Sequence, residues 1–208
     1  MFDDTFLFAA LADAPLERRV LLLSVRRADE FGLFQRAGWR VAINGLMAAE
    51  AVDLGALDID FPEWPPAPGS VAMVLGDLAA FTPDHIALIG RDRPAVVKAN
   101  FVSSPIDGGA FLLPESGDRM LEAAAALAET LHGSGYACWV STWYRNDVMP
   151  HMWKLDASPD LLTARLGAAF PFNLIGFREP ALGERMETLS ETFKHQRSLF
   201  DPFRDSYP

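Results

Sequence analysis

One cysteine and four histidines are the side chains of this sequence best suited to nucleophilic or acid–base chemistry. Cys138 could act as a nucleophile with His151 as its base, because a thiol becomes reactive when a neighbouring base takes its proton. If Asn146-Asp147 is a two-residue turn, residue 142 pairs with His151 and residue 155 with Cys138. The two side chains then share a face but lie two residue pairs apart, which disfavours a catalytic dyad. A lone cysteine in an apolar strand more often packs as an inert small hydrophobe.

The other motifs do not predict a metal or phosphate site. The histidines lack metal-ligand spacing, and strand alternation would place His151 and Met152 on opposite faces, which disfavours a copper site at residues 149–152. The glycines of residues 132–135 follow a predicted helix, whereas a phosphate cradle precedes one. Those of residues 107–109 lie between two predicted strands. We therefore expect no metal site, and the sequence leaves any cofactor unknown.

The strands that carry Cys138 and His151 are predicted to have two different faces. Residues 136–145 and 148–155 alternate with a period of two, which is typical of a hairpin. One alternate set, which contains Cys138, is mainly apolar and resembles the side that helices cover. The other set mixes indoles with polar groups and consists of Trp139, Ser141, Trp143, Arg145, Met152 and Lys154. Such a mixture does not suit a dry core and usually marks a contact surface.

We predict that this second set forms an open binding face. If the strand at residues 95–102 packs in the same way, Lys98 and Asn100 also point toward it. The predicted ligand-binding residues are Trp139, Trp143, Arg145, Met152, Lys98 and Asn100. The cationic side chains would neutralise an anion, and the indoles would supply stacking area. The alternative is that the N-terminal residues or the Trp64 segment cover this face, because Trp is highly buried on average.

The elements that must position these residues are predicted from residue 70 onward. Besides the hairpin, strands are expected at residues 70–75, 95–102, 110–113 and 172–178, and helices from Thr82-Pro83, at 116–132, from Ser158 and at 181–200. Paired strands separated by helices indicate a mostly antiparallel sheet with helices packed on one face. The predicted fold class is therefore α+β.

The N-terminal residues, 1–66, are predicted to form a mainly helical lobe. Asp13-Ala-Pro15 resembles a helix start, with a proline in the first turn. Residues 20–23 could instead form a short buried strand, and residues 39–53 fit either a strand or a helix.

A proline-rich segment ends this lobe. The four prolines of Phe61–Gly69 exclude a helix and an interior strand there. We predict that residues 67–208 form a separate α+β sheet domain. One continuous domain, 1–208, is the alternative.

Composition excludes several classes of protein. The 208 residues are 50% hydrophobic, so the chain can bury a core and is not disordered. The net charge of −10 comes without a basic patch, which argues against a nucleic-acid partner or an anionic membrane surface. A single cysteine excludes an internal disulfide. The sequence contains no transmembrane run and no basic signal-peptide start, so we expect a cytoplasmic protein.

The predicted function is that of a binding protein. Its open sheet face would hold a small acidic or planar ligand, or a protein partner. The first alternative is a hydrolase or transferase with a cleft site that uses His151, Cys138 or Asp107. The second is a homo-oligomeric interaction protein, in which the same face is buried against another copy.

Overall fold

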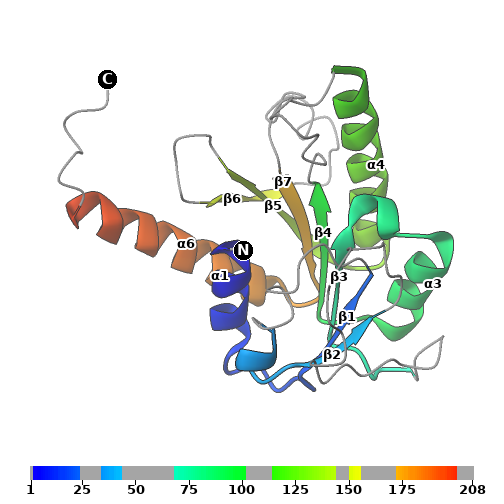
Figure 1. Ribbon diagram of the computed structural model, residues 1–208, viewed down its shortest axis with the longest axis horizontal. Helices are drawn as coiled ribbons and strands as arrows, with labels where there is room; N and C mark the ends of the chain where they lie inside the picture. Colours follow the sequence, from blue (N-terminus) through cyan, green and yellow to red (C-terminus); the bar gives the residue numbers. More distant parts are fainter. Residues whose placement is uncertain are drawn as a thin grey trace, which may run out of the picture.

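Seven strands form the sheet of the described residues, which are 2–23, 34–43, 68–101, 114–143, 150–155 and 172–200 of this computed structural model. Figure 1 shows this sheet in the middle of the molecule with helices on both sides. In chain order the elements are α1 (Phe2–Leu11), β1 (Arg19–Leu22), β2 (Arg40–Ile43), β3 (Met73–Asp77), η2 (Leu78–Ala80), α3 (Pro83–Asp92), β4 (Val96–Phe101), α4 (Pro114–Gly133), β5 (Ala137–Trp143), β6 (Pro150–Leu155), β7 (Phe172–Phe177) and α6 (Pro180–Phe200).

The sheet mixes parallel and antiparallel pairs in the order β2-β1-β3-β4-β7-β5-β6. The first four of these strands are parallel, and β7, β5 and β6 follow with antiparallel pairings. Because β5 is antiparallel to β7, it runs in the same direction as β4. The carboxyl ends of β1, β3, β4 and β5 therefore lie at one edge of the sheet. The predicted α+β class is confirmed, with a mixed sheet in place of a mostly antiparallel one.

The N-terminal residues contribute two strands where the sequence predicts a mainly helical lobe. β1 and β2 pair within the same sheet as β3, so the strand alternative at residues 20–23 is confirmed. The residues after α1 form a turn and not a helix at Asp13. The Arg18 guanidinium lies within 3.3 Å of the Ala12 carbonyl, to which it donates.

The predicted boundary at residue 66 lies outside the described residues. Strands from both sides of it share one sheet, which favours the alternative of one continuous domain. The strand predicted at residues 110–113 and the helix predicted from Ser158 also lie outside the described residues.

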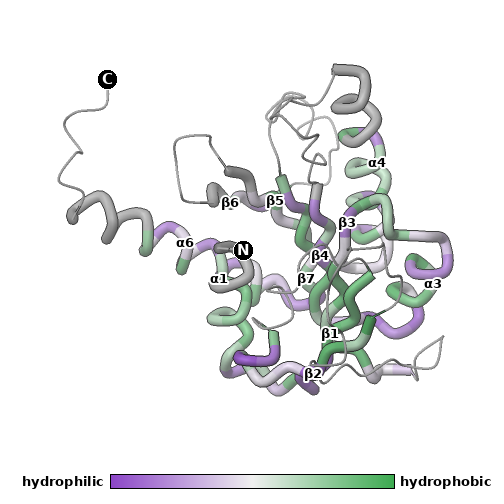
Figure 2. The backbone as a smooth tube through the Cα atoms, viewed as in Figure 1, coloured by the Kyte–Doolittle hydropathy of each residue, from purple (hydrophilic) through white to green (hydrophobic). Residues whose placement is uncertain are grey.

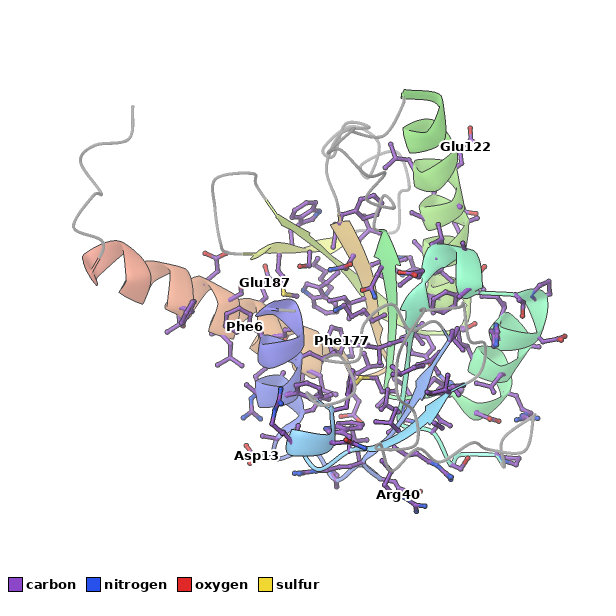
Figure 3. All side chains as sticks on the ribbon, in the orientation of Figure 1. Phe6, Asp13, Arg40, Glu122, Phe177 and Glu187 are labelled. Atoms are coloured by element: carbon purple, nitrogen blue, oxygen red, sulfur yellow. The ribbon has the colours of Figure 1, made fainter. Side chains whose placement is uncertain are left out.

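Helices cover both faces of the sheet, whereas the sequence predicts them on one. α1 and α6 pack on one face, against side chains such as Phe177, and we call it the α1/α6 face. α3 and α4 pack on the opposite α3/α4 face, against side chains such as Leu174. Figure 3 shows Phe177 and Phe6 on the side of the sheet where α1 and α6 lie, and Glu122 on α4 at the other side.

On the α3/α4 face, α3 begins where the sequence predicts, and α4 begins two residues before the predicted Ser116 and packs its apolar side on the sheet as expected. Thr82 is the N-cap of α3, and its backbone N–H donates to Nδ1 of His85 at 3.1 Å. Burial lowers the pKa of His85, which favours the neutral ring that accepts this bond. Leu127 of α4 is buried against the sheet, and Glu129 is exposed. Among the described residues, no helix has the length and apolar character needed to cross a membrane.

Candidate functional site

The predicted pairing of the hairpin is confirmed. β5 and β6 are antiparallel, with Cys138 opposite Leu155 and Thr142 opposite His151. Strand alternation then places Trp139 and the alternate residues of β5 on the α1/α6 face. The two sets of side chains that the sequence distinguishes do lie on opposite faces.

Trp139 belongs to the core and not to an open face. Its side chain is fully buried, and its ring meets that of Phe177 edge-on with 5.4 Å between centroids. The indole Nε1–H donates to Oε2 of Glu187 in α6 at 2.8 Å, so the polar group of the ring is satisfied. A Cβ on Gly183 would come within 2.4 Å of the ring. The absence of a side chain there lets α6 approach the indole this closely.

The prediction of an open face is wrong at three of its residues. Trp139, Met152 and Lys98 are 0%, 5% and 2% exposed, while Asn100 is half-buried. The physical reason is that helices cover this face as well, which the prediction of helices on one face did not allow. Glu187, expected to point outward, is half-buried because it accepts the indole N–H.

The outer part of the predicted face is only partly described. Lys154 on β6 is exposed, and its Nζ lies 5.3 Å from the centroid of the Trp139 ring and 3.8 Å from Glu184 of α6. Only the backbone of Trp143 is described, and Arg145 lies outside the described residues. Their part in a binding site stays a prediction.

Four polar residues lie side by side on the α1/α6 face toward the carboxyl ends of β3, β4 and β5. The register places Asp77 opposite Asn100. Asn173 of β7 is opposite Asn100 on one side and opposite Ser141 on the other. We call these four residues the polar row. Lys98 belongs to the same face of β4, two residues before Asn100, so a buried lysine lies next to the row.

Burial makes the polar row energetically expensive. Asp77 is 7% exposed and Asn173 9%, while Ser141 is completely buried. Moving polar or charged groups out of water costs several kcal/mol unless partners replace the lost hydration. Asp77, Lys98 and Asn173 each have an interaction partner in the structure. The buried Oγ of Ser141 has none, and such an unsatisfied group costs about 1–3 kcal/mol.

The position of the row in the sheet is typical of a ligand site. Open α/β sheets bind ligands outside the carboxyl ends of their parallel strands, where the loops diverge. Asp77 is the last residue of β3, and Asn100 is the penultimate residue of β4. Figure 2 shows hydrophilic positions near the upper end of β4, while the lower part of the sheet is mostly hydrophobic. The row is therefore the candidate functional site of the described residues.

The candidate catalytic residues are not brought together within the described part of the chain. Cys138 lies on the α3/α4 face, and burial raises its pKa to about 12. Its thiol therefore stays protonated at neutral pH, which disfavours a nucleophilic role. The side chain of His151 and the whole of Asp107 lie outside the described residues. Among the residues that are described, no group of three His, Cys, Asp or Glu side chains could hold a metal ion.

Two of the five residues of this candidate site had been singled out from the sequence. Lys98 and Asn100 were predicted as binding residues, and Ser141 was assigned to the correct face without a role. Asp77 and Asn173 were missed. The available signal was one polar residue in each of several otherwise apolar strands, because a buried strand has no solvation reason to include one.

Comparison with known proteins adds no family assignment. No protein-family model matches the chain, and a search of curated proteins found no similar sequence. The function must therefore be argued from the site itself.

Proposed function

We propose that this chain is a small-molecule-binding protein whose site is the polar row together with Lys98. The observation that carries the proposal is the Oγ of Ser141, which is completely buried without a hydrogen-bond partner in line with three other polar side chains. Buried polar groups in native proteins nearly always have partners, and an exception calls for an explanation. A ligand hydroxyl or carbonyl would supply the missing partner.

The burial of the row supports a small ligand over a protein partner. The sequence alone suggested a small acidic or planar ligand, or a protein, on an open face. A protein partner of standard size needs about 800 Å² of accessible surface on each side. Side chains that are 0–9% exposed, as Ser141, Lys98 and Asn173 are, cannot contribute much to such a surface.

A binding role also accounts for polar groups that stability alone does not favour. Well-packed apolar residues in place of buried polar or ionic groups are often neutral or stabilising. Sites that depart from local rules of stability are commonly functional ones. The hydrolase or transferase alternative has less support, because the high pKa of Cys138 opposes one of its three candidates.

Native mass spectrometry of the protein purified from cells tests this proposal. We expect a retained small molecule, whose mass appears again when the denatured protein is analysed. Ser141→Ala should lose the molecule, whereas Cys138→Ala should keep it. The two variants make a matched pair, because each shortens a fully buried side chain of β5 by one heavy atom on opposite faces.

Two results would contradict the proposal. One is equal retention of the molecule by wild type and Ser141→Ala. The other is a protein that retains nothing and whose unfolding temperature no ligand series raises. The same spectra report the oligomeric state, so they also test the homo-oligomer alternative.

A further inference from the structure

A hydrogen bond to a histidine closes the connection between β3 and α3. Asp77, the last residue of β3, is followed by η2 and then by Thr82, the N-cap of α3. The backbone N–H of Thr82 donates to Nδ1 of His85 at 3.1 Å, and Oγ1 of Thr82 lies 2.9 Å from the same nitrogen. The two residues form a capping box, in which the third residue of the helix reaches back to the N-cap.

Histidine is an unusual residue for this position of a capping box. Glu or Gln ordinarily occupies it, because a side-chain oxygen accepts the N–H of the N-cap residue. An imidazole nitrogen accepts only while it carries no proton, and the protonated ring has two donors and no acceptor. Since the backbone N–H of Thr82 can only donate, its bond requires an unprotonated Nδ1 on His85. This bond therefore exists only when the ring is neutral.

We propose that His85 is a pH-sensitive latch, whose protonation opens the connection between β3 and α3 in the folded protein. A proton on Nδ1 would point at the N–H of Thr82, so that attraction becomes repulsion. The charged ring would also lie in the first turn of α3, where the helix dipole disfavours a cation. The segment that loosens, residues 78–82, begins directly after Asp77 at the carboxyl end of β3. The latch needs no ligand and does not depend on the proposed function.

The surroundings of the ring favour its neutral form at neutral pH. His85 is 8% exposed, and burial lowers its pKa, while a hydrogen bond with the Ala80 backbone in η2 and the charge of Asp84 in α3 oppose this shift. An unfolded histidine titrates near about pH 6.5, so the folded protein takes up this proton only at a lower pH. The stability that the neutral ring contributes is therefore complete above about pH 6.5 and is lost as the pH falls through the lowered pKa.

Amide hydrogen exchange of the whole chain tests the latch in a series from about pH 7.5 to about pH 4.5, which stays above the usual titration of carboxyl groups. After correction for the intrinsic exchange rates, residues 78–86 should lose protection about fivefold or more toward the acidic end, as expected when a helix cap is lost. Residues 121–131 of α4 serve as the internal control and should keep their protection throughout.

His85→Gln is the matched variant for this experiment. A Gln side chain accepts the N–H of Thr82 at every pH and completes an ordinary capping box. We expect residues 78–86 of His85→Gln to stay protected throughout the series, and those of His85→Ala to be poorly protected throughout. The same acid-dependent loss in His85→Gln as in wild type would assign the effect to another group and overturn the latch.

Nitrogen NMR of the wild-type imidazole ring gives a second measurement that needs no variant. Nδ1 of His85 should be the unprotonated nitrogen at neutral pH, and the loss of protection at residues 78–86 should follow the protonation of this ring. A proton on Nδ1 at neutral pH would overturn the latch. So would a ring that stays neutral throughout the series, or a protonated ring with unchanged protection of the segment.

Discussion

The two faces of the sheet differ most in polarity at the polar row, where adjacent residues of one strand point to opposite faces. The polar row lies on the α1/α6 face, and the chain neighbours of its members lie on the α3/α4 face. These neighbours are Gly76, Ala99 and Val140, which precede members of the row, and Leu174, which follows Asn173 in the antiparallel strand β7. Both sets belong to the same four strands and differ by only one position along each strand. Nearness to the edge therefore does not explain why one set is polar and the other apolar.

Under the proposed function, stability and binding are divided between the two faces of the sheet. The α3/α4 face is packed with apolar side chains from strands and helices. The buried polar side chains of the described strands, Asp77, Lys98, Ser141 and Asn173, all belong to the other face. Confining them there leaves one continuous apolar layer to stabilise the fold. Five substitutions test this comparison, and we take them from the largest expected effect to the smallest.

The largest effect is expected on the α3/α4 face. Leu127 is 5% exposed and belongs to the hydrophobic core of that face. Leu127→Ala should destabilise the protein by about 2–5 kcal/mol, because the lost contacts and the remaining cavity add. Chemical denaturation measures the change, and binding of any ligand to the folded variant should persist. A loss below 1 kcal/mol would show that this face is not the main source of stability.

The close approach of α6 to the opposite face gives the next prediction. In Gly183→Ala the new Cβ would lie 2.4–2.6 Å from three atoms of the buried Trp139 ring. We expect a loss of about 1–3 kcal/mol from overpacking, which exceeds the gain in helix propensity of about 1 kcal/mol. Gly90→Ala in α3 is the control, since nothing lies within 4 Å of its added Cβ.

Gly90→Ala should stabilise the protein slightly, because only the propensity gain remains. If both glycine variants gained stability in thermal unfolding, α6 would not be tightly packed on Trp139. The α1/α6 face would then be looser than its contacts indicate.

The fold could be predicted from the sequence where a local pattern sufficed. The hairpin register followed from period-two alternation around a turn, and the start of α3 followed from Thr82-Pro83. For β1 and β2 the sequence left a strand only as one of two alternatives, because four-residue buried parallel strands lack alternation. The direction of strand pairing was beyond local patterns, since β4 pairs with residues more than seventy positions away in β7.

The site was predicted less well, for a reason visible at Trp139. An indole next to polar residues suggested an exposed surface, but its N–H bonds to Glu187, 48 residues away. No pattern within β5 shows that partner. Ser141 was passed over because a single serine in a strand carries no signal until its burial is known. Lys98 and Asn100 were found because alternation alone assigns them to the face.

The next prediction concerns stability at alkaline pH, where we expect a smaller effect than for the Leu127 and Gly183 variants. Burial raises the pKa of Cys138 to about 12, whereas an unfolded thiol titrates near 8.5. The folded protein therefore holds this proton more tightly, so the contribution is complete below about pH 8.5 and is lost as pH rises toward 12. We expect the denaturation midpoint of wild type to fall between about pH 8.5 and 10, and that of Cys138→Ala to fall less. If the denaturation midpoints of the two proteins fell equally with rising pH, the apolar environment assigned to this thiol would be wrong.

The stability of Ser141→Ala in protein freed of ligand tests the central claim most directly. If the Oγ of Ser141 is kept for a ligand, removing it relieves an unsatisfied buried group. The variant should then be as stable as wild type or up to about 2 kcal/mol more stable, although it no longer binds. Cys138→Ala, matched on the opposite face, should lose about 1–2 kcal/mol and keep binding. A loss for Ser141→Ala equal to or larger than that for Cys138→Ala would show that the hydroxyl supports the fold, and the polar row would then be structure and not a site.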